Sequence, residues 1–400
     1  MFYKENNFKN TEIGEVPKDW ETIKVKDAIE EVTKYAHKIK TREYLARGSF
    51  PVVDQSSSFI AGYTNYNAPF TDVPVIVFGD HTGILKYIDF DFVMGADGTK
   101  ILKPKNAIYA KYLYFVLKGS RFRTEGYRRH MAILRELTIS ISKNSHEQQK
   151  IAEILSNIDT AIQKTNELVI SSQRLKKGLM QSLLTKGIGH KKFEETEIGK
   201  IPAGWEIKKV MDLFEVETGT TPATRNAEYW ENGTVTWLTP TDLSTVKGVY
   251  LGDSKRKVTD RALKETNLTL LPKGSILLST RAPVGYAAII MQDSTFNQGC
   301  KGLIPKANVK STEEFYCYYL IKSKTLLQNL SSGSTFKELA KDRLENFLVP
   351  VPPVSERHKI SEILLKLDKE LEADRRELIY LRKIKKGFMN ELLSGKVRVK

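Results

Sequence analysis

The sequence has little cysteine and no long hydrophobic run. Its two cysteines, Cys300 and Cys317, are too few for a disulfide framework and do not have metal-ligand spacing, so we expect free thiols in the cytoplasm. No apolar stretch approaches the roughly 18 residues that a membrane-spanning helix needs. The opening residues "MFYKENNFKN" contain no apolar core. We therefore expect neither a membrane span nor a signal peptide.

Recognisable catalytic motifs are also missing. The sequence contains no P-loop and no HExxH, and its six histidines are scattered. Its only Pro-Pro pair, Pro352-Pro353, lies in "VPPV" and does not match the Asn/Asp-Pro-Pro-aromatic motif of amino-methylating sites. We expect a protein without catalysis of its own and without a bound metal or cofactor. The alternative is an enzyme, such as a nuclease or a methyltransferase, with a divergent active site.

Positive charge is what the chain has in excess. It contains 63 Lys and Arg against 48 Asp and Glu, which gives a net charge of +15. This balance favours a polyanionic partner such as nucleic acid, although a lysine-rich solvated surface would produce it as well. At 400 residues the chain is too long for one ordinary core, so two or three domains are expected.

The sequence repeats itself. The segment "TEIGEVPKDWE", residues 11–21, returns as "TEIGKIPAGWE" at residues 196–206, an offset of 185. A second pair, "SHEQQKIAEILSNIDTAI" from Ser145 and "VSERHKISEILLKLDKEL" from Val354, has an offset of 209. The chain therefore alternates a variable block with a repeated element, and this period of about 200 residues indicates duplication of a whole unit rather than a solenoid.

The repeated element is predicted to be one long helix. Hydrophobic residues recur in steps of three and four, as in Ile151, Leu155 and Ile158, a spacing typical of a coiled-coil seam. Ser145 and Gln148 have the spacing of a capping box at its start. From about residue 147 to 185 the helix would measure roughly 55–60 Å. We predict that the two copies pair as an antiparallel coiled coil; the alternative is that each packs on its own domain.

The variable blocks are predicted to be mixed α/β. "FPVVDQ" and "VPVIVFGD" in the first block, and "VTWLTPTDL" and "GSILLSTRAPVGYAAII" in the second, are short apolar strands bounded by turns. A helix follows late in each block, in "AIYAKYLYFVLKGSRFR" and "TEEFYCYYLIKSKTLLQNL". The two blocks are thus expected to share a fold but few residues. Trp20 and Trp205 occupy the same repeat position and are expected to pack in the cores.

Taken together, these segments resemble the specificity subunit of type I restriction–modification enzymes. The resemblance covers essentially the whole chain and rests on the two "TEIG" openings, "VFGDHTGILKYIDFDFVMGADGTKILKP", "STRAPVGYAAIIMQDSTFNQGCKGLIP", "SGSTFKEL", "VPVPPVSERHKISEIL" and the helix ends "KKGLMQSLL" and "KKGFMNELL". Each segment alone is weak, but their order within a duplicated chain is specific to that family.

The resemblance implies two target recognition domains, at residues 1–145 and 191–354, and two conserved spacer helices, at 146–190 and 355–400. Each domain would bind one half of a bipartite sequence in double-stranded DNA. The helices would set the gap between the halves and dock two methyltransferase subunits, which restriction subunits then join. S-adenosylmethionine for methylation of adenine N6, Mg²⁺ and ATP would bind the partner subunits. A non-specific DNA-binding protein or a coiled-coil scaffold is the alternative.

The densest basic segment, residues 121–135, is the first candidate for DNA contact. Arginine can grip phosphate or pair bidentately with guanine. The candidates here are Arg121, Arg123, Arg128, Arg129 and His130. At the offset of 209, "STFKEL" aligns with this segment and adds Ser334, Thr335 and Lys337. The alternative is a solvated basic helix end.

Polar turns after apolar strands supply the remaining candidates. In the first half these are Asp80, His81 and Thr82 of "FGDHTG", with Lys86 beyond. In the second half they are Thr280 and Arg281 of "STRAPVG", and Asn297, Gln298 and Lys301 of "NQGCK". Asn and Gln suit adenine edges, but residues of these types equally often cap ordinary turns.

Overall fold

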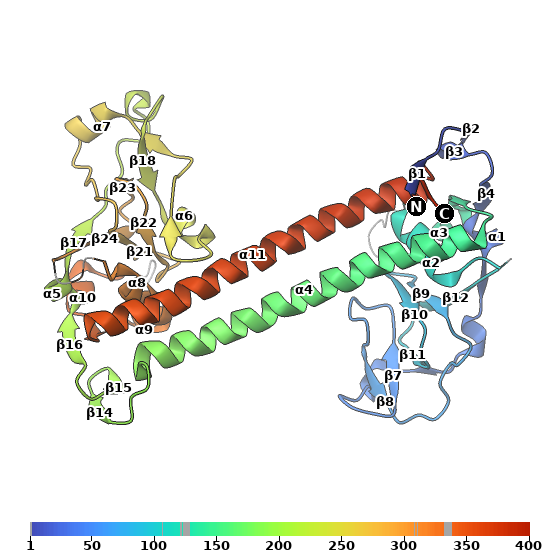
Figure 1. Ribbon diagram of the computed structural model, residues 1–400, viewed down its shortest axis with the longest axis horizontal. Coiled ribbons are helices and arrows are strands. Elements are labelled where there is room, and N and C mark those ends of the chain that lie inside the picture. The colour runs from blue at the N-terminus through green and yellow to red at the C-terminus, as the bar shows by residue number, and fades with distance from the viewer. Residues whose placement is uncertain are drawn as a thin grey trace. The chain divides into compact units, whose positions relative to one another are not determined.

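Figure 1 shows the computed structural model of the chain. The structure describes residues 2–105, 107–120, 122, 129–307, 309, 311–331 and 338–400. Contacts divide the chain into two compact units: unit 1 is Met1–Thr165 with Glu377–Lys400, and unit 2 is Asn166–Arg376. The division falls within both long helices, so the domain limits predicted from the repeat are not tested by it and stay predictions.

Unit 1 is built on two small sheets. The order of the first is β10 (Leu85–Ile88), β9 (Val75–Gly79), β12 (Thr99–Pro104), β5 (Ile29–Glu31), and that of the second is β6 (Lys38–Ile39), β11 (Val93–Gly95), β7 (Phe50–Val53), β8 (Gly62–Thr64). Every residue of β9 is buried, because it is an inner strand covered on both faces. Helix α2 (Ala110–Gly119) contributes six buried residues to the core beside it.

Unit 2 repeats this plan with longer insertions. Its first sheet has the order β17 (Phe214–Thr218), β24 (Cys300–Pro305), β21 (Ile276–Ser279), β22 (Ala287–Ile290), β19 (Tyr250–Leu251), and its second β20 (Lys257–Val258), β18 (Val235–Leu238), β23 (Thr295–Phe296). Parallel pairing of β18 with β23 matches that of β7 with β11. Helix α8 (Glu313–Lys322) packs on β22. The prediction of two similar mixed α/β domains is confirmed.

Short elements complete both units. In unit 1 they are β1 (Phe2–Lys4), β2 (Phe8–Thr11), β3 (Gly14–Pro17), β4 (Glu21–Lys24), α1 (Val25–Ala28), η1 (Thr33–Tyr35), η2 (Thr41–Glu43), α3 (Met131–Glu136), β13 (Thr138–Ile141) and β26 (Val397–Val399). In unit 2 they are β14 (Phe193–Thr196), β15 (Gly199–Pro202), β16 (Glu206–Lys209), α5 (Val210–Leu213), η3 (Ala227–Tyr229), α6 (Pro240–Thr245), α7 (Asp260–Glu265), α9 (Lys324–Leu330), α10 (Lys341–Glu345) and β25 (Leu348–Val351).

The repeated element forms the two long helices, α4 (Ser145–Lys186) and α11 (Val354–Leu393). The predicted capping box at Ser145 is wrong. Asn144 caps α4 instead, since its Oδ1 accepts hydrogen bonds from the backbone amides of His146 and Glu147, at 2.9 and 3.2 Å. The Gln148 side chain turns to the core, where its Oε1 accepts a bond from the amide of Tyr109.

The two helices run antiparallel. Unit 1 contains the first part of α4 and the last part of α11, joined by an ion pair between Asp159 and Lys385. Unit 2 contains the complementary parts, joined by an ion pair between Lys176 and Asp368. An offset of 209 converts one pair into the other, so each unit makes the same contact between the two helices. The predicted antiparallel pairing of two duplicated helices is confirmed.

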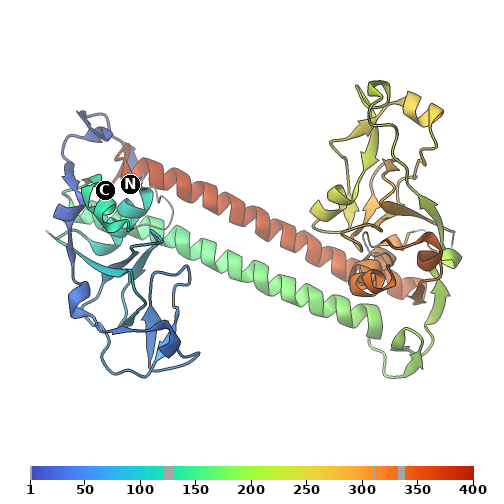
Figure 2. The same cartoon turned by 180° about the vertical axis from the view of Figure 1, so that it is seen from behind.

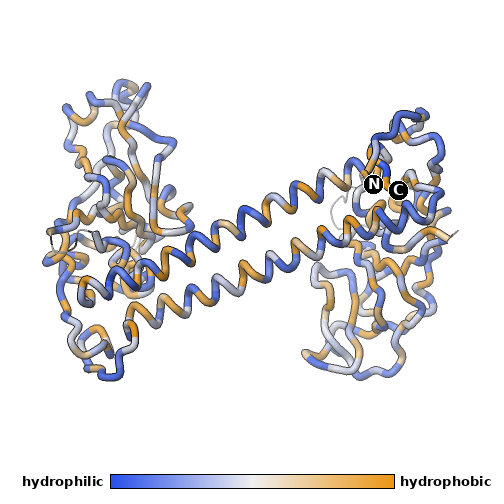
Figure 3. Tube along the Cα trace, in the orientation of Figure 1, coloured by the Kyte–Doolittle hydropathy of each residue, from blue (hydrophilic) through white to orange (hydrophobic). Residues whose placement is uncertain are grey.

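Both long helices carry a hydrophobic seam. Figure 3 shows hydrophobic and hydrophilic residues alternating along each of them. Near their first turns the seam packs into the domain cores, through Ile151 and Leu155 in unit 1 and through Ile360 and Leu364 in unit 2. Burial continues toward mid-helix at Thr165, Val169, Leu371 and Leu378. Packing on a domain and pairing with the other helix, which the sequence left as alternatives, therefore both occur.

The repeated opening segments anchor the long helices to their domains. The buried Trp20 donates from Nε1 to Glu147 near the start of α4, at 3.2 Å, and Trp205 donates in the same way to Glu356 in α11, at 3.0 Å. Glu147 and Glu356 are related by the offset of 209. The prediction that both tryptophans are structural is confirmed.

The chain ends meet in unit 1. Strand β1 pairs antiparallel with β26, which places the two termini side by side (Figures 1 and 2). Arg398 of β26 is 5% exposed and donates to Glu147 at 2.5 and 2.9 Å, to Asp19 at 2.8 and 3.0 Å and to Glu5 at 2.7 Å. At the equivalent place in unit 2, the His190 ring lies 2.8 Å from Glu356.

Candidate nucleic-acid interface

The predicted DNA-contacting turns have the same backbone architecture in both units. After β9 the amide of Asp80 donates to the carbonyl of Gly98, at 2.7 Å, and after β21 the amide of Thr280 donates to that of Gly299, at 2.8 Å. The next links also match. The Asp80 carbonyl accepts from the amide of His130, at 2.7 Å, and the Thr280 carbonyl accepts from Leu339, at 2.9 Å. Each turn is thus hydrogen-bonded to the residues just before a short helix, which is α3 in unit 1 and α10 in unit 2.

Three of the candidates in the first unit are buried. Asp80 is 5% exposed and its Oδ1 accepts from the amide of Met131, at 2.7 Å, which caps α3. The His130 ring is fully buried, with Nδ1 2.9 Å from the Asp80 carbonyl. Lys86 donates to the carbonyls of Asp54 and Ser58, each at 2.6 Å, and burial lowers its pKa. In this structure these side chains hold the loops together.

His81 and Thr82 lie nearer the surface, and Gln55 fixes them there. The Gln55 side chain accepts from the amide of His81 at 3.2 Å and donates to the carbonyl of Asp97 at 2.6 Å. Its backbone carbonyl accepts from the Thr82 hydroxyl at 2.8 Å. Gly98 has φ +80°, and a Cβ there would lie 2.6 Å from the His81 ring. Gln55 thus positions His81 and Thr82, a role that the sequence does not reveal because a lone Gln in a polar loop gives no signal.

The basic segment is described only in part. Arg129 is exposed, and Arg135 of α3 pairs with Glu31 at 2.9 Å. Arg121, Arg123 and Arg128 lie outside the described residues, and so do Ser334, Thr335 and Lys337 of the matching segment in unit 2. Their predicted contact with DNA stays a prediction.

The candidates of unit 2 form two hydrogen-bonded groups. Arg281 is exposed and donates to Glu338 at 3.0 Å, while the buried Lys301 lies 3.8 Å from the same carboxylate and has its pKa lowered by burial. Thr280 is buried behind them, with its hydroxyl 3.3 Å from the Gly299 carbonyl. The protein's own carboxylate at Glu338 therefore balances both cations.

Asn297 and Gln298 form the second group. Asn297 caps its own turn, because its Oδ1 accepts from the amide of Gly299, at 2.6 Å. Its Nδ2 donates to the Thr221 hydroxyl at 3.0 Å and to Gln298 Oε1 at 3.2 Å, and the Thr221 hydroxyl also bonds Gln298. The turn-cap role that the sequence left open is present. Contact with DNA at either residue stays a prediction.

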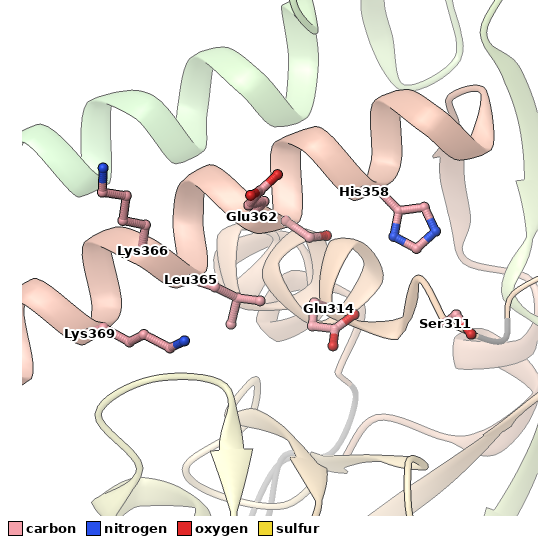
Figure 4. A pocket seen from close by; sticks show the side chains of 8 residues that line it. Ser311, Glu314, His358, Glu362, Leu365, Lys366 and Lys369 are labelled. Carbon is pink, nitrogen blue, oxygen red and sulfur yellow. The ribbon is translucent and has the colours of Figure 1, made fainter.

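A groove of about 500 Å³ lies in unit 2, between the first half of α11 and the chain around α8 (Figure 4). It is lined by Ser311, Glu314, His358, Ser361, Glu362, Leu365, Lys366 and Lys369. Acidic and basic side chains both line it, as on a solvated helix surface. Within the described ranges no three His, Cys, Asp or Glu residues come together as a possible metal site. No helix in the described part of the chain is both long and apolar enough to cross a bilayer.

Comparison with known proteins gives the same assignment for both halves. The family described as "Type I restriction modification DNA specificity domain" matches residues 17–171 and 202–380. The MjaIX specificity subunit of Methanocaldococcus jannaschii is 43% identical over 195 residues, 48% of this chain and 44% of that protein. The MjaVIII specificity subunit of the same organism is 26% identical over 426 residues, 100% of this chain and 98% of that protein.

A solved structure shares the fold. The crystal structure of the type I restriction–modification S subunit from M. genitalium superposes with a TM-score of 0.64 at 16% identity, over 94% of this chain and 96% of that one. The two matched ranges of the family together span far more than half of the 400 residues. The chain therefore belongs to the family of type I restriction–modification specificity subunits, and it carries two copies of the family's domain.

Proposed function

We propose that this chain recognises a bipartite sequence in double-stranded DNA, with one half bound by each unit. The observation that carries the proposal is one scaffold built twice with different surfaces. The turns after β9 and β21 have equivalent backbone hydrogen bonds, yet they present His81 and Thr82 in one unit and Arg281 in the other. Two similar domains with unlike surfaces suit two unlike half-sites. The net charge of +15 suits the phosphate backbone.

In this proposal the long helices set the gap and dock partners. Helix α4 has 42 residues and α11 has 40, roughly 60 Å each. Both carry exposed hydrophobic side chains that a monomer does not need: Leu168, Ile170, Leu175, Ile363, Ile379, Tyr380 and Ile384. These are suitable contacts for two methyltransferase subunits, which restriction subunits would then join. The repetition of the helices supports a pair of equivalent docking sites.

The chemistry would belong entirely to those partners. S-adenosylmethionine, from which the methyl group reaches adenine N6, would bind the methyltransferase subunits, while Mg²⁺ and ATP would serve the complex elsewhere. The specificity chain would position the target and carry no catalytic group. Membership of the family supports this part of the proposal, together with a cytoplasmic location.

Salt dependence of DNA binding tests the proposal. The complex of this chain with its methyltransferase subunits should bind a duplex containing the target with log K falling linearly as log salt rises. The expected slope is about −0.9 for each phosphate contacted. A duplex with both half-sites scrambled should bind more weakly at every salt concentration, by about 10³-fold or more. Equal affinity for both duplexes would indicate non-specific binding, and absence of salt-dependent binding would indicate a scaffold.

A further inference from the structure

An arginine in unit 2 lies beside two tryptophan rings that contact each other. The Arg256 guanidinium is 4.6 Å from the centre of the Trp230 ring and 4.4 Å from that of Trp237. The rings are nearly perpendicular, at 88°, with centroids 5.0 Å apart. We call these three residues the Trp–Arg stack. Planar guanidinium groups favour such aromatic contacts.

The protein holds both rings in place. Trp237 is a residue of β18 and is 1% exposed, and its Nε1 donates to the carbonyl of Thr220, at 3.2 Å. Trp230 follows η3 and donates from Nε1 to the carbonyl of Ala223, at 3.3 Å. With their polar atoms satisfied, the rings present fixed apolar surfaces to Arg256.

The backbone of Arg256 is equally well fixed. Its carbonyl accepts from the amide of Trp237 at 3.0 Å, which continues the pairing of β18 with β20, and its amide donates to the Ser254 hydroxyl at 3.2 Å. Asp253, three residues before Arg256, is also held to β18, since it accepts a hydrogen bond from the Thr236 hydroxyl at 2.7 Å. The Thr236 hydrogen bond, followed by the one from Lys257, lowers the pKa of Asp253 to about 2.

Among the residues that the structure describes, the Arg256 guanidinium makes no hydrogen bond or ion pair, and the residue is exposed. Nearby carboxylates already have partners: Asp253 pairs with Lys257 at 2.9 Å, and Arg261 of α7 pairs with Glu228 at 2.7 Å. Arg256 is therefore an oriented cation whose N–H groups are available to a ligand.

Unit 1 lacks this stack at the equivalent place. Val52 of β7 is the equivalent of Trp237, because Val52 is the first residue of β7 paired with β11 and Trp237 is the first residue of β18 paired with β23. On the antiparallel side, Val52 pairs with Gly62 and Trp237 pairs with Arg256. Gly62 is therefore the equivalent of Arg256. The scaffold is shared and the side chains differ, as expected of a surface that distinguishes two half-sites.

We propose that the Trp–Arg stack is a DNA contact of unit 2, in which Arg256 donates two parallel N–H bonds to a pair of acceptors. The inference rests on the proposed function and deepens it. Two acceptor pairs on DNA fit this fork: O6 and N7 of a guanine in the major groove, and two oxygens of one phosphate. Contact with the two indoles restricts the position of the guanidinium before binding, so little side-chain freedom is lost when the bonds form.

The test compares Arg256→Ala with Arg261→Ala in the assembled complex with methyltransferase subunits. Both arginines are exposed and lie close in sequence, but Arg261 is held by Glu228 and Glu265. Arg256→Ala is expected to weaken binding of the target duplex about tenfold or more, while Arg261→Ala leaves it unchanged. Arg256→Lys, which keeps the charge but loses the planar fork, should recover only part of the loss. Thermal unfolding of each variant checks that the fold is intact.

Duplexes altered one base pair at a time distinguish the two acceptors. Lost discrimination at a single position in Arg256→Ala indicates a guanine contact. A uniform loss over all duplexes, with the salt slope reduced by about 1, indicates a phosphate contact. Unchanged affinity, discrimination and slope in a folded Arg256→Ala complex would overturn the inference. If the unaltered complex itself fails to prefer its target, the proposed function fails, and this inference with it.

Discussion

Replacing Arg398 by alanine is expected to lower the free energy of unfolding of unit 1 by about 3–5 kcal/mol, the usual effect of leaving a buried charge without its partner. Arg398 and Glu147 are 5% and 2% exposed, and their bonds of 2.5 and 2.9 Å join the C-terminal strand to the start of α4. Without the guanidinium, the Glu147 carboxylate keeps, among the described residues, the hydrogen bonds from the Ser142 hydroxyl and the Trp20 N–H. Urea denaturation followed by tryptophan fluorescence measures the change.

Two variants serve as controls for this prediction. Arg398→Lys keeps the charge but cannot form the bidentate bonds to Asp19 and Glu147, so it should recover part of the loss. His190→Ala removes the equivalent partner of Glu356 in unit 2, where a single contact of 2.8 Å is involved, and should cost about 1 kcal/mol. An effect of Arg398→Ala no larger than that of His190→Ala would show that the bonds of Arg398 do not stabilise unit 1 to this extent.

The hydrogen bonds of Arg398 also predict how the free energy of unfolding lost in Arg398→Ala depends on pH. The hydrogen bond from Arg398 lowers the pKa of Asp19, and backbone hydrogen bonds followed by Arg398 lower that of Glu5. A carboxyl group whose pKa is lower in the folded state stabilises the fold above its unfolded pKa, near 4, and loses that contribution as the pH falls. The difference in stability between the unaltered chain and Arg398→Ala should therefore shrink below about pH 4.

Adding four residues to each long helix, after Thr165 in α4 and after Asp374 in α11, is expected to abolish methylation of the original target. Methylation should move to a sequence with the same two halves and a gap longer by one or two base pairs. Four residues lengthen an α-helix by about 6 Å, and each base pair of B-DNA spans about 3.4 Å. The insertion points are related by the offset of 209, and neither separates the members of the ion pairs Asp159–Lys385 and Lys176–Asp368.

Sequencing of N6-methyladenine in cells that carry the lengthened chain measures the new gap. Lys164→Ala, an exposed substitution beside the insertion point, leaves the helix length unchanged and should leave the gap unchanged. Retention of the original gap in the lengthened chain would show that the helices are not what sets it.

The sequence predicted the architecture well because the architecture is repeated. Two copies of one pattern showed where the long helices begin, and the antiparallel pairing follows from the duplication. The failure at the start of α4 is local. Ser145 and Gln148 have the spacing of a capping box, but Asn144 caps the helix, and the amide of Tyr109 and the carbonyl of Ser142 hold Gln148. Tertiary hydrogen bonds to a side chain are not visible in a spacing rule.

The candidate site was harder to predict, because polar residues in turns can bind either DNA or the backbone of their own chain. Asp80 and Asn297 suit a base edge as well as a backbone amide, and in the structure both bond amides of their own chain. The Trp–Arg stack gave no signal at all. Trp230, Trp237 and Arg256 follow no shared periodicity. The pairing of β18 with β20 brings Trp237 and Arg256 together, and the turn that ends η3 adds Trp230.

We expect this chain to specify one bipartite DNA sequence. Genome-wide mapping of N6-methyladenine, in the source organism with and without the gene for this chain, measures that specificity. Deletion of the gene should remove methylation at a single motif made of two unlike halves around a fixed gap, and restoring the gene should restore it. Methylation of that motif persisting after deletion, or a lost motif that is not bipartite, would show that the chain does not have this function.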